Sequence, residues 1–95
     1  MKIEAYRDLI SEGQRVAGVD YHSCTTGNEK RAWLKNAIRV RDELASAGNP
    51  RRTERDAAAH QQAHLRLCEL IAATMQWSKE ADASLQLLAF GAEYR

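Results

Sequence analysis

The chain has 95 residues, with 14 Lys and Arg against 13 Asp and Glu and a formal net charge of +1. This length supports one hydrophobic core and not two, so we expect residues 1–95 to form a single helical domain. The balance of charges excludes a strong overall field that would steer the chain toward polyanions.

Alanine and leucine dominate the apolar residues. The sequence has 16 Ala and 9 Leu, against 7 Val and Ile combined. Ala and Leu favour helices, whereas β-branched residues favour strands. We therefore predict an all-α fold, a small up-and-down bundle of three long helices plus a short C-terminal fourth.

The first two predicted helices are separated by a turn. Apolar residues recur at helical spacing over residues 3–17, and small and polar residues then predict a turn over residues 18–27. Thr26 and Glu29 form a capping-box pair at which the second helix begins. The segment Gly48-Asn49-Pro50 is expected to end that helix, because Pro cannot continue it.

The third predicted helix begins at Thr53 and Asp56, which are spaced as a second capping pair. No helix-breaking residue occurs from Ala57 to Trp77. Ser78 is a candidate N-cap for the short fourth helix. The alternative is that the third and fourth helices are fused through Ser78.

Motifs for catalysis are absent from the sequence. It contains no GxxxxGK[ST], GxSxG or GxGxxG motif, and no Glu-x-x-His pair of the kind that holds metals in helical bundles. We therefore predict no catalytic residue, no cofactor and no enzymatic activity.

Neither a membrane span nor a secretory signal is predicted. The chain has no run of about 20 apolar residues, and its first eight residues include four charges and no apolar segment. The two cysteines, Cys24 and Cys68, are too few for a disulfide scaffold. We therefore expect a cytoplasmic protein with reduced thiols.

The third predicted helix carries His60, His64 and Cys68 at successive i, i+4 positions, a spacing that can chelate a metal. The backbones of His60 and Cys68 are about 12 Å apart along a helix, so one zinc ion cannot bind all three side chains. A site would use His64 with Cys68, completed by two residues of the first turn. No metal is predicted, and the residues that would form such a site are His22, Cys24, His60, His64 and Cys68.

The alternative is that the two histidines are structural. Helical periodicity places His60 and His64 on an inward stripe with Leu67, Ile71 and Met75. Buried imidazoles need hydrogen-bond partners. We expect residues 21–24 to fold back toward this end of the third helix, and the candidate partners are Tyr6, Tyr21, Ser23 and Asn36.

Charged residues of one sign recur at i, i+4 and i+8 on the first and second predicted helices, and a further basic group lies where the third helix begins. Like charges at this spacing cost about 0.2–0.5 kcal/mol each in an isolated helix. These residues form either a solvated surface or a surface for a charged partner or a second copy. The candidate partner-binding residues are Glu4, Asp8, Glu12, Arg31, Lys35, Arg39, Arg51, Arg52 and Arg55.

We interpret the chain as a non-enzymatic helical protein that acts by protein–protein association, as a homodimer, an adaptor or an inhibitor. By its composition alone, a short helical chain rich in Ala and Arg, it suits an accessory protein of a mobile genetic element. One alternative is a nucleic-acid-binding regulatory module with a basic surface on the second and third helices, although Glu54 and Asp56 interrupt that surface. A small metal-binding helical protein is the other alternative.

Overall fold

The computed structural model describes the backbone of residues 1–91 and the side chains of residues 1–79. Its elements are α1 (Ile3–Arg15), the π-helical turn η1 (Val16–Asp20), α2 (Tyr21–Ser23), α3 (Gly27–Ser46) and α4 (Glu54–Gly91). The described residues form only helices and the loops between them, which confirms the all-α prediction.

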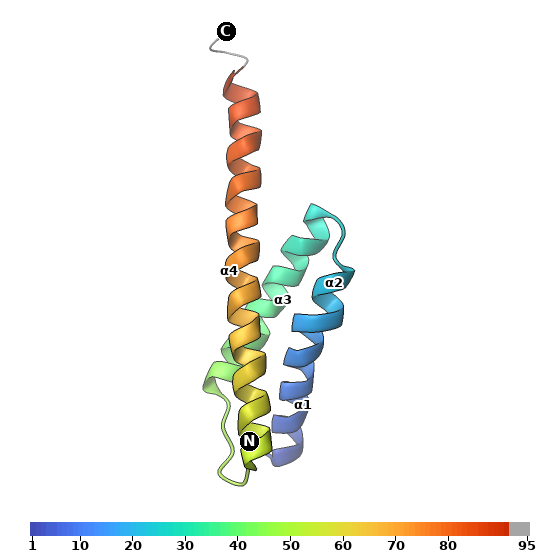
Figure 1. Cartoon of the computed structure of the whole chain (residues 1–95), viewed down its shortest axis with the longest axis vertical. Helices are drawn as coiled ribbons and strands as arrows, with labels where there is room; N and C mark the ends of the chain where they lie inside the picture. Colours follow the sequence, from blue (N-terminus) through green and yellow to red (C-terminus); the bar gives the residue numbers. More distant parts are fainter. Residues whose placement is uncertain (92–95) are drawn as a thin grey trace.

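The chain runs up through α1, down through α3 and up again through α4, so successive long helices are antiparallel (Figure 1). The fold measures 65 × 21 × 17 Å. Its length comes from α4, because a helix of 38 residues is about 57 Å long. Figure 1 shows α4 continuing well past the ends of α1 and α3.

The prediction of a separate short fourth helix is wrong, because α4 is continuous from Glu54 to Gly91. Ser78 lies inside this helix instead of capping a new one. The sequence between Ala57 and Phe90 contains neither Pro nor Gly, so nothing forces the backbone out of the helical region. The fused alternative is the correct one.

The predicted turn over residues 18–27 is also mostly helical. The helix continues from α1 through η1 and α2 to Ser23, which leaves only residues 24–26 outside a helix. The indole Nε1–H of buried Trp33 donates a hydrogen bond of 2.8 Å to the carbonyl oxygen of Val16, the first residue of η1. A π-helical turn widens the helix locally and frees a carbonyl for such a donor.

The predicted capping pairs are confirmed, the first of them in part, because the Glu29 carboxylate accepts from the Thr26 hydroxyl and not from the Thr26 backbone N–H. The Thr26 hydroxyl accepts from the Glu29 backbone N–H at 3.1 Å, and α3 begins at the next residue, Gly27. At the start of α4 the pair is reciprocal, because the Thr53 hydroxyl accepts from the Asp56 N–H while the Asp56 carboxylate accepts from the Thr53 N–H, both at 3.1 Å. The second helix ends at Ser46, just before the predicted stop.

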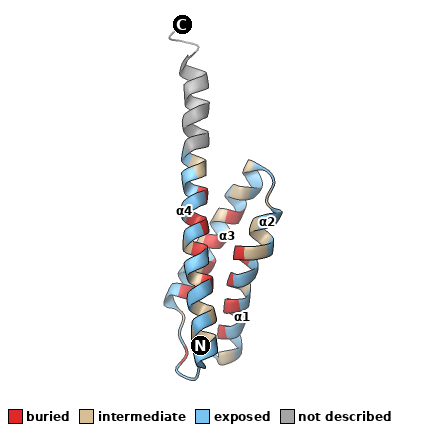
Figure 2. Cartoon of the chain, viewed as in Figure 1, coloured by how far each residue is buried: buried red, intermediate tan, exposed pale blue. Residues whose placement is uncertain are grey.

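The core lies between α1, α3 and the first half of α4 (Figure 2). At Gly13, α1 packs closely against α3 and α4. A Cβ atom on this residue would lie only 2.9 Å from Leu44 Cδ1 and 3.4 Å from Ala63 Cβ. The buried apolar side chains are Tyr6, Leu9, Ile10, Val16, Ala17, Trp33, Ala37, Val40, Leu44, Ala63, Leu67, Leu70 and Ile71.

The inward face of α4 is rotated from the predicted stripe. Leu67 and Ile71 are buried as expected, but the Met75 side chain is 47% exposed and His64 is half-buried. The helix instead buries Ala63, Leu70 and Thr74. The hydroxyl of Thr74 donates to the Leu70 carbonyl at 2.7 Å, which satisfies this polar group inside the core.

His60 joins all three long helices. Its Nε2 lies 2.7 Å from the carbonyl oxygen of Leu44 in α3, and its Nδ1 lies 2.6 Å from the hydroxyl of Tyr6 in α1. Because a carbonyl only accepts, Nε2 carries the hydrogen and Nδ1 accepts the Tyr6 hydroxyl proton. The Arg52 guanidinium donates to the same hydroxyl oxygen at 3.3 Å. Tyr6 was among the partners predicted for this histidine.

The predicted folding of residues 21–24 toward His60 is wrong. The Tyr21 ring packs edge-on against Trp33 and lines a small cavity with Thr74 and Trp77. Thr74 is 14 residues beyond His60 on α4, which is about 20 Å along the helix axis. The cause is the continued helix, since η1 and α2 carry this segment away from the start of α4.

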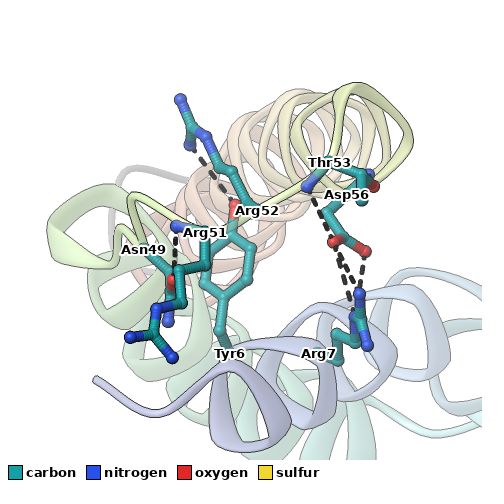
Figure 3. A network of polar contacts seen from close by, with 7 residues as sticks. All are labelled: Tyr6, Arg7, Asn49, Arg51, Arg52, Thr53 and Asp56. Carbon is teal, nitrogen blue, oxygen red and sulfur yellow. Dashed lines mark hydrogen bonds and ion pairs between the residues drawn. The ribbon is translucent and has the colours of Figure 1, made fainter.

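Polar contacts tie the start of α4 and the loop before it to α1 (Figure 3). The Arg7 guanidinium donates to the Asp56 carboxylate at 3.2 Å. The side-chain amide of buried Asn49 donates to the Met1 carbonyl at 2.7 Å, and its oxygen accepts from the Arg51 N–H at 2.8 Å. At this end of the bundle, polar contacts therefore connect the N-terminal segment with α1, the loop before α4 and the start of α4.

The Tyr6→Phe variant tests the His60 junction. Removing the hydroxyl leaves the Nδ1 acceptor of His60 and one Arg52 donor without this partner, so we expect the free energy of unfolding to fall by about 1–2 kcal/mol. Urea unfolding followed by circular dichroism measures the change. Tyr21→Phe is the matched control, because the Tyr21 hydroxyl has no hydrogen bond to the described residues. Equal losses in both variants would contradict the role of the junction.

The Asp56→Asn variant tests the contact between α1 and α4. The Arg7 guanidinium, and then the Thr53 backbone N–H, lower the pKa of Asp56. A lowered folded-state pKa adds stability that is complete above the unfolded value of about 3.9 and is lost as the pH falls through the folded value. The difference in the free energy of unfolding between wild type and variant should stay constant above about pH 5 and should shrink as the pH falls below about 4.

Asp8→Asn is the control for this titration, because Asp8 is exposed and has no ion pair with the described residues. Thermal unfolding between neutral and acidic pH gives the two curves. If the stability difference between wild type and Asp56→Asn persists unchanged into the acidic range, the ionised carboxylate does not contribute as described.

Candidate association surface

The outer face of α4 carries an uncharged, mostly apolar row that points away from the core. Leu65 is 52% exposed and Met75 is 47% exposed. The row alternates steps of three and four residues, which is the spacing that brings two helices together in coiled coils. We call it the α4 seam, and it consists of Ala58, Gln61, Leu65, Cys68, Ala72 and Met75.

The α4 seam lies opposite the buried side of the same helix, where Leu67 and Leu70 enter the core. None of its six residues is charged. The nearest described ion pair on α4 joins Arg66 to Glu69 at 3.3 Å, beside the seam and not across it. The seam is therefore a straight, uncharged strip edged by polar groups. The alternating spacing is visible in the sequence and could have revealed it.

The predicted charge stripes partly neutralise each other inside the chain. Arg39 donates to Glu12 across the α1–α3 contact at 2.5 Å and also reaches Glu43 at 3.0 Å. The hydrogen bond from Glu12 raises the pKa of the Arg39 guanidinium, followed by that from Glu43. The antiparallel packing of α1 and α3 causes this pairing. Glu4 and Asp8 are exposed on α1.

The predicted basic residues with exposed side chains lie in two groups, toward opposite ends of α3. Arg31 and Lys35 lie in the first half of α3, and both are exposed. Arg51 and Arg52 lie in the loop between α3 and α4, and Arg55 lies in the first turn of α4. Lys35 is 11 residues from the end of α3 at Ser46, which corresponds to about 16 Å along the axis.

The five candidate metal ligands fall in three places. His22 is exposed on α2, and Cys24 follows it with its thiol donating to the Asp20 carbonyl at 3.3 Å. His60 is used by the junction with Tyr6 and Leu44. Only His64 and Cys68 are adjacent, with the sulfur 3.9 Å from Nε2. Within residues 1–79, no three His, Cys, Asp or Glu side chains are grouped so that they could hold a metal.

Burial disfavours the thiolate that metal binding at Cys24 would require. It raises the pKa of the Cys24 thiol, and the nearby Glu29 and Asp20 carboxylates raise it further. The predicted four-ligand site of His22, Cys24, His64 and Cys68 is therefore not assembled within the described chain.

Among the hollows beside the long helices, two contain residues singled out above. A shallow groove of about 670 Å³ runs between the end of α3 and the start of α4, and its lining includes Leu44, Arg52, His60 and His64. The smaller cavity of about 210 Å³ lies near Trp77, whose ring has the Lys30 ammonium 4.8 Å from its centre.

His60 already uses both ring nitrogens in the junction, which leaves it no free nitrogen to act as a general base.

Within the described residues, no helix combines the length and the hydropathy that a membrane span requires. No protein family, curated protein or solved structure matches the chain. The functional proposal therefore rests on the geometry and chemistry of the surfaces described above.

Proposed function

We propose that this chain is a non-enzymatic helical protein that acts by protein–protein association, and that its first partner is a second copy of itself. The α4 seam is the proposed contact surface. The observation that carries this proposal is the row of uncharged side chains with exposed Leu65 and Met75 at coiled-coil spacing on the longest helix.

The seam suits pairing with itself for two reasons. It is uncharged, so a twofold contact places no like charges opposite each other. It also contains the small residues Ala58, Cys68 and Ala72, which let two helices approach closely. Full burial of an exposed Leu or Met side chain contributes about 1.5–3 kcal/mol, and covering the exposed half of Leu65 or Met75 contributes about half of that. Two copies together contribute four such side chains.

The exposed charges provide a second route to association. Glu4, Asp8, Arg31 and Lys35 are exposed, and an adaptor or inhibitor of charged targets would use them. The separation of the basic residues gives no support to the nucleic-acid alternative. A cytoplasmic location and a role as an accessory protein of a mobile genetic element belong to the same proposal.

Paired substitutions on the α4 seam test this function. Wild type should elute in size-exclusion chromatography with light scattering at about twice the 10.7 kDa chain mass. Leu65→Gln with Met75→Gln removes apolar contact area from each copy, so we expect the dimer dissociation constant to rise at least about tenfold. Circular dichroism checks that the variant keeps its helices.

Val19→Gln is the matched control, because Val19 is 70% exposed but lies on η1, away from the seam. This variant should remain as dimeric as wild type. A wild type that stays monomeric at micromolar concentration would contradict self-association, and equal weakening by Val19→Gln would contradict the choice of surface.

A further inference from the structure

The pair of His64 and Cys68 is not used by the fold. The Cys68 sulfur lies 3.9 Å from His64 Nε2 and 4.0 Å from Nδ1, and both side chains are half-buried. Among the described residues, neither side chain has another polar contact. This distinguishes them from His60, which joins three helices, and from Cys24, whose thiol donates to carbonyl oxygens.

The separation of the two donor atoms fits shared coordination of one metal ion. With Zn–N near 2.0–2.1 Å and Zn–S near 2.3 Å, tetrahedral geometry places nitrogen and sulfur about 3.6 Å apart. The observed 3.9 Å differs by a few tenths of an ångström, and because the sulfur is almost equally far from both ring nitrogens, the imidazole must also rotate to point one nitrogen at the shared ion. Imidazole and thiolate together are ligands that zinc prefers.

One chain supplies only half of a tetrahedral site, since no third ligand lies nearby among the described residues. Cys68 belongs to the α4 seam, and His64 lies one residue before Leu65 at its edge. If the twofold axis passes beside residues 64–68, a second copy seated on the seam brings its own histidine and cysteine to the same place. Four ligands would then surround one point on that axis.

We propose that the α4 seam binds one zinc ion per two chains, through His64 and Cys68 of each copy. This inference rests on the self-association proposed above. On binding, each Cys68 thiol releases its proton to solvent and coordinates as thiolate, while each His64 coordinates as neutral imidazole. Two thiolates balance the charge of Zn²⁺, so the completed site leaves the uncharged seam uncharged.

The experiment uses the full chain, treated with chelator and then titrated with ZnCl₂. We expect binding to saturate at one zinc per two chains, and the dimer dissociation constant to fall at least about tenfold in zinc. Cobalt substituted for zinc should show the charge-transfer absorption of thiolate ligands. Cys68→Ser and His64→Gln should each abolish these effects, while Cys24→Ser and His22→Gln should preserve them.

The outcomes separate the two proposals. If the chain forms a dimer that depends on Leu65 and Met75, and this dimer does not bind added zinc, the metal site is overturned and self-association stands. A chain that is monomeric with and without zinc would overturn both. Saturation at one zinc per monomeric chain, or loss of zinc binding in Cys24→Ser with retention in Cys68→Ser, would also overturn the proposed site.

Discussion

The arrangement of the three long helices depends on the two hydrogen bonds of His60. The imidazole occupies the space between α1 and α3, with the buried Tyr6 hydroxyl on one nitrogen and the Leu44 carbonyl on the other. A ring held on both sides permits little rotation of α4 about its axis. The close contact of Gly13 with Leu44 and Ala63 fixes the same helices a turn away. Together these contacts determine which face of α4 enters the core.

That rotation has a direct consequence for function. With Ala63, Leu67 and Leu70 inside, the opposite residues of α4 face outward, and these include Leu65 and Met75. The His64–Cys68 pair lies at the boundary between the two faces, half-buried and outside the core network. The association surface and the metal half-site that we propose therefore both depend on the rotation of α4 about its axis. This surface follows α4 from Ala58 to Met75.

Local features of the fold were predictable, because local chemistry causes them. The capping pairs at Thr26 and Thr53 and the stop before Pro50 follow from side chains and backbones a few residues apart. The predicted helix start at Ser78 is wrong because serine is compatible with both an N-cap and a helix interior. The small residues around Gly18 indicate a turn, but the bond from Trp33 to Val16 stabilises a π-helical turn there.

Contacts between distant residues account for what the sequence did not reveal at the candidate site. The pairing of Glu12 with Arg39 requires knowing that α1 and α3 pack antiparallel in one register. The inward stripe of α4 was predicted slightly rotated, because His60 and Met75 fit a helical period that also fits Ala63 and Thr74. The α4 seam itself was detectable from its alternating spacing. Its exposure followed only from the packing.

The most direct test of this account is the tautomer of His60, measured by long-range ¹H–¹⁵N imidazole correlation at neutral pH. The chain has three histidines, so single substitutions of His22 and His64 assign the spectrum. The account predicts that His60 is a fixed tautomer with hydrogen on Nε2 and an accepting Nδ1. A tautomer with hydrogen on Nδ1, or rapid averaging between the two forms, would contradict the junction that orients α4.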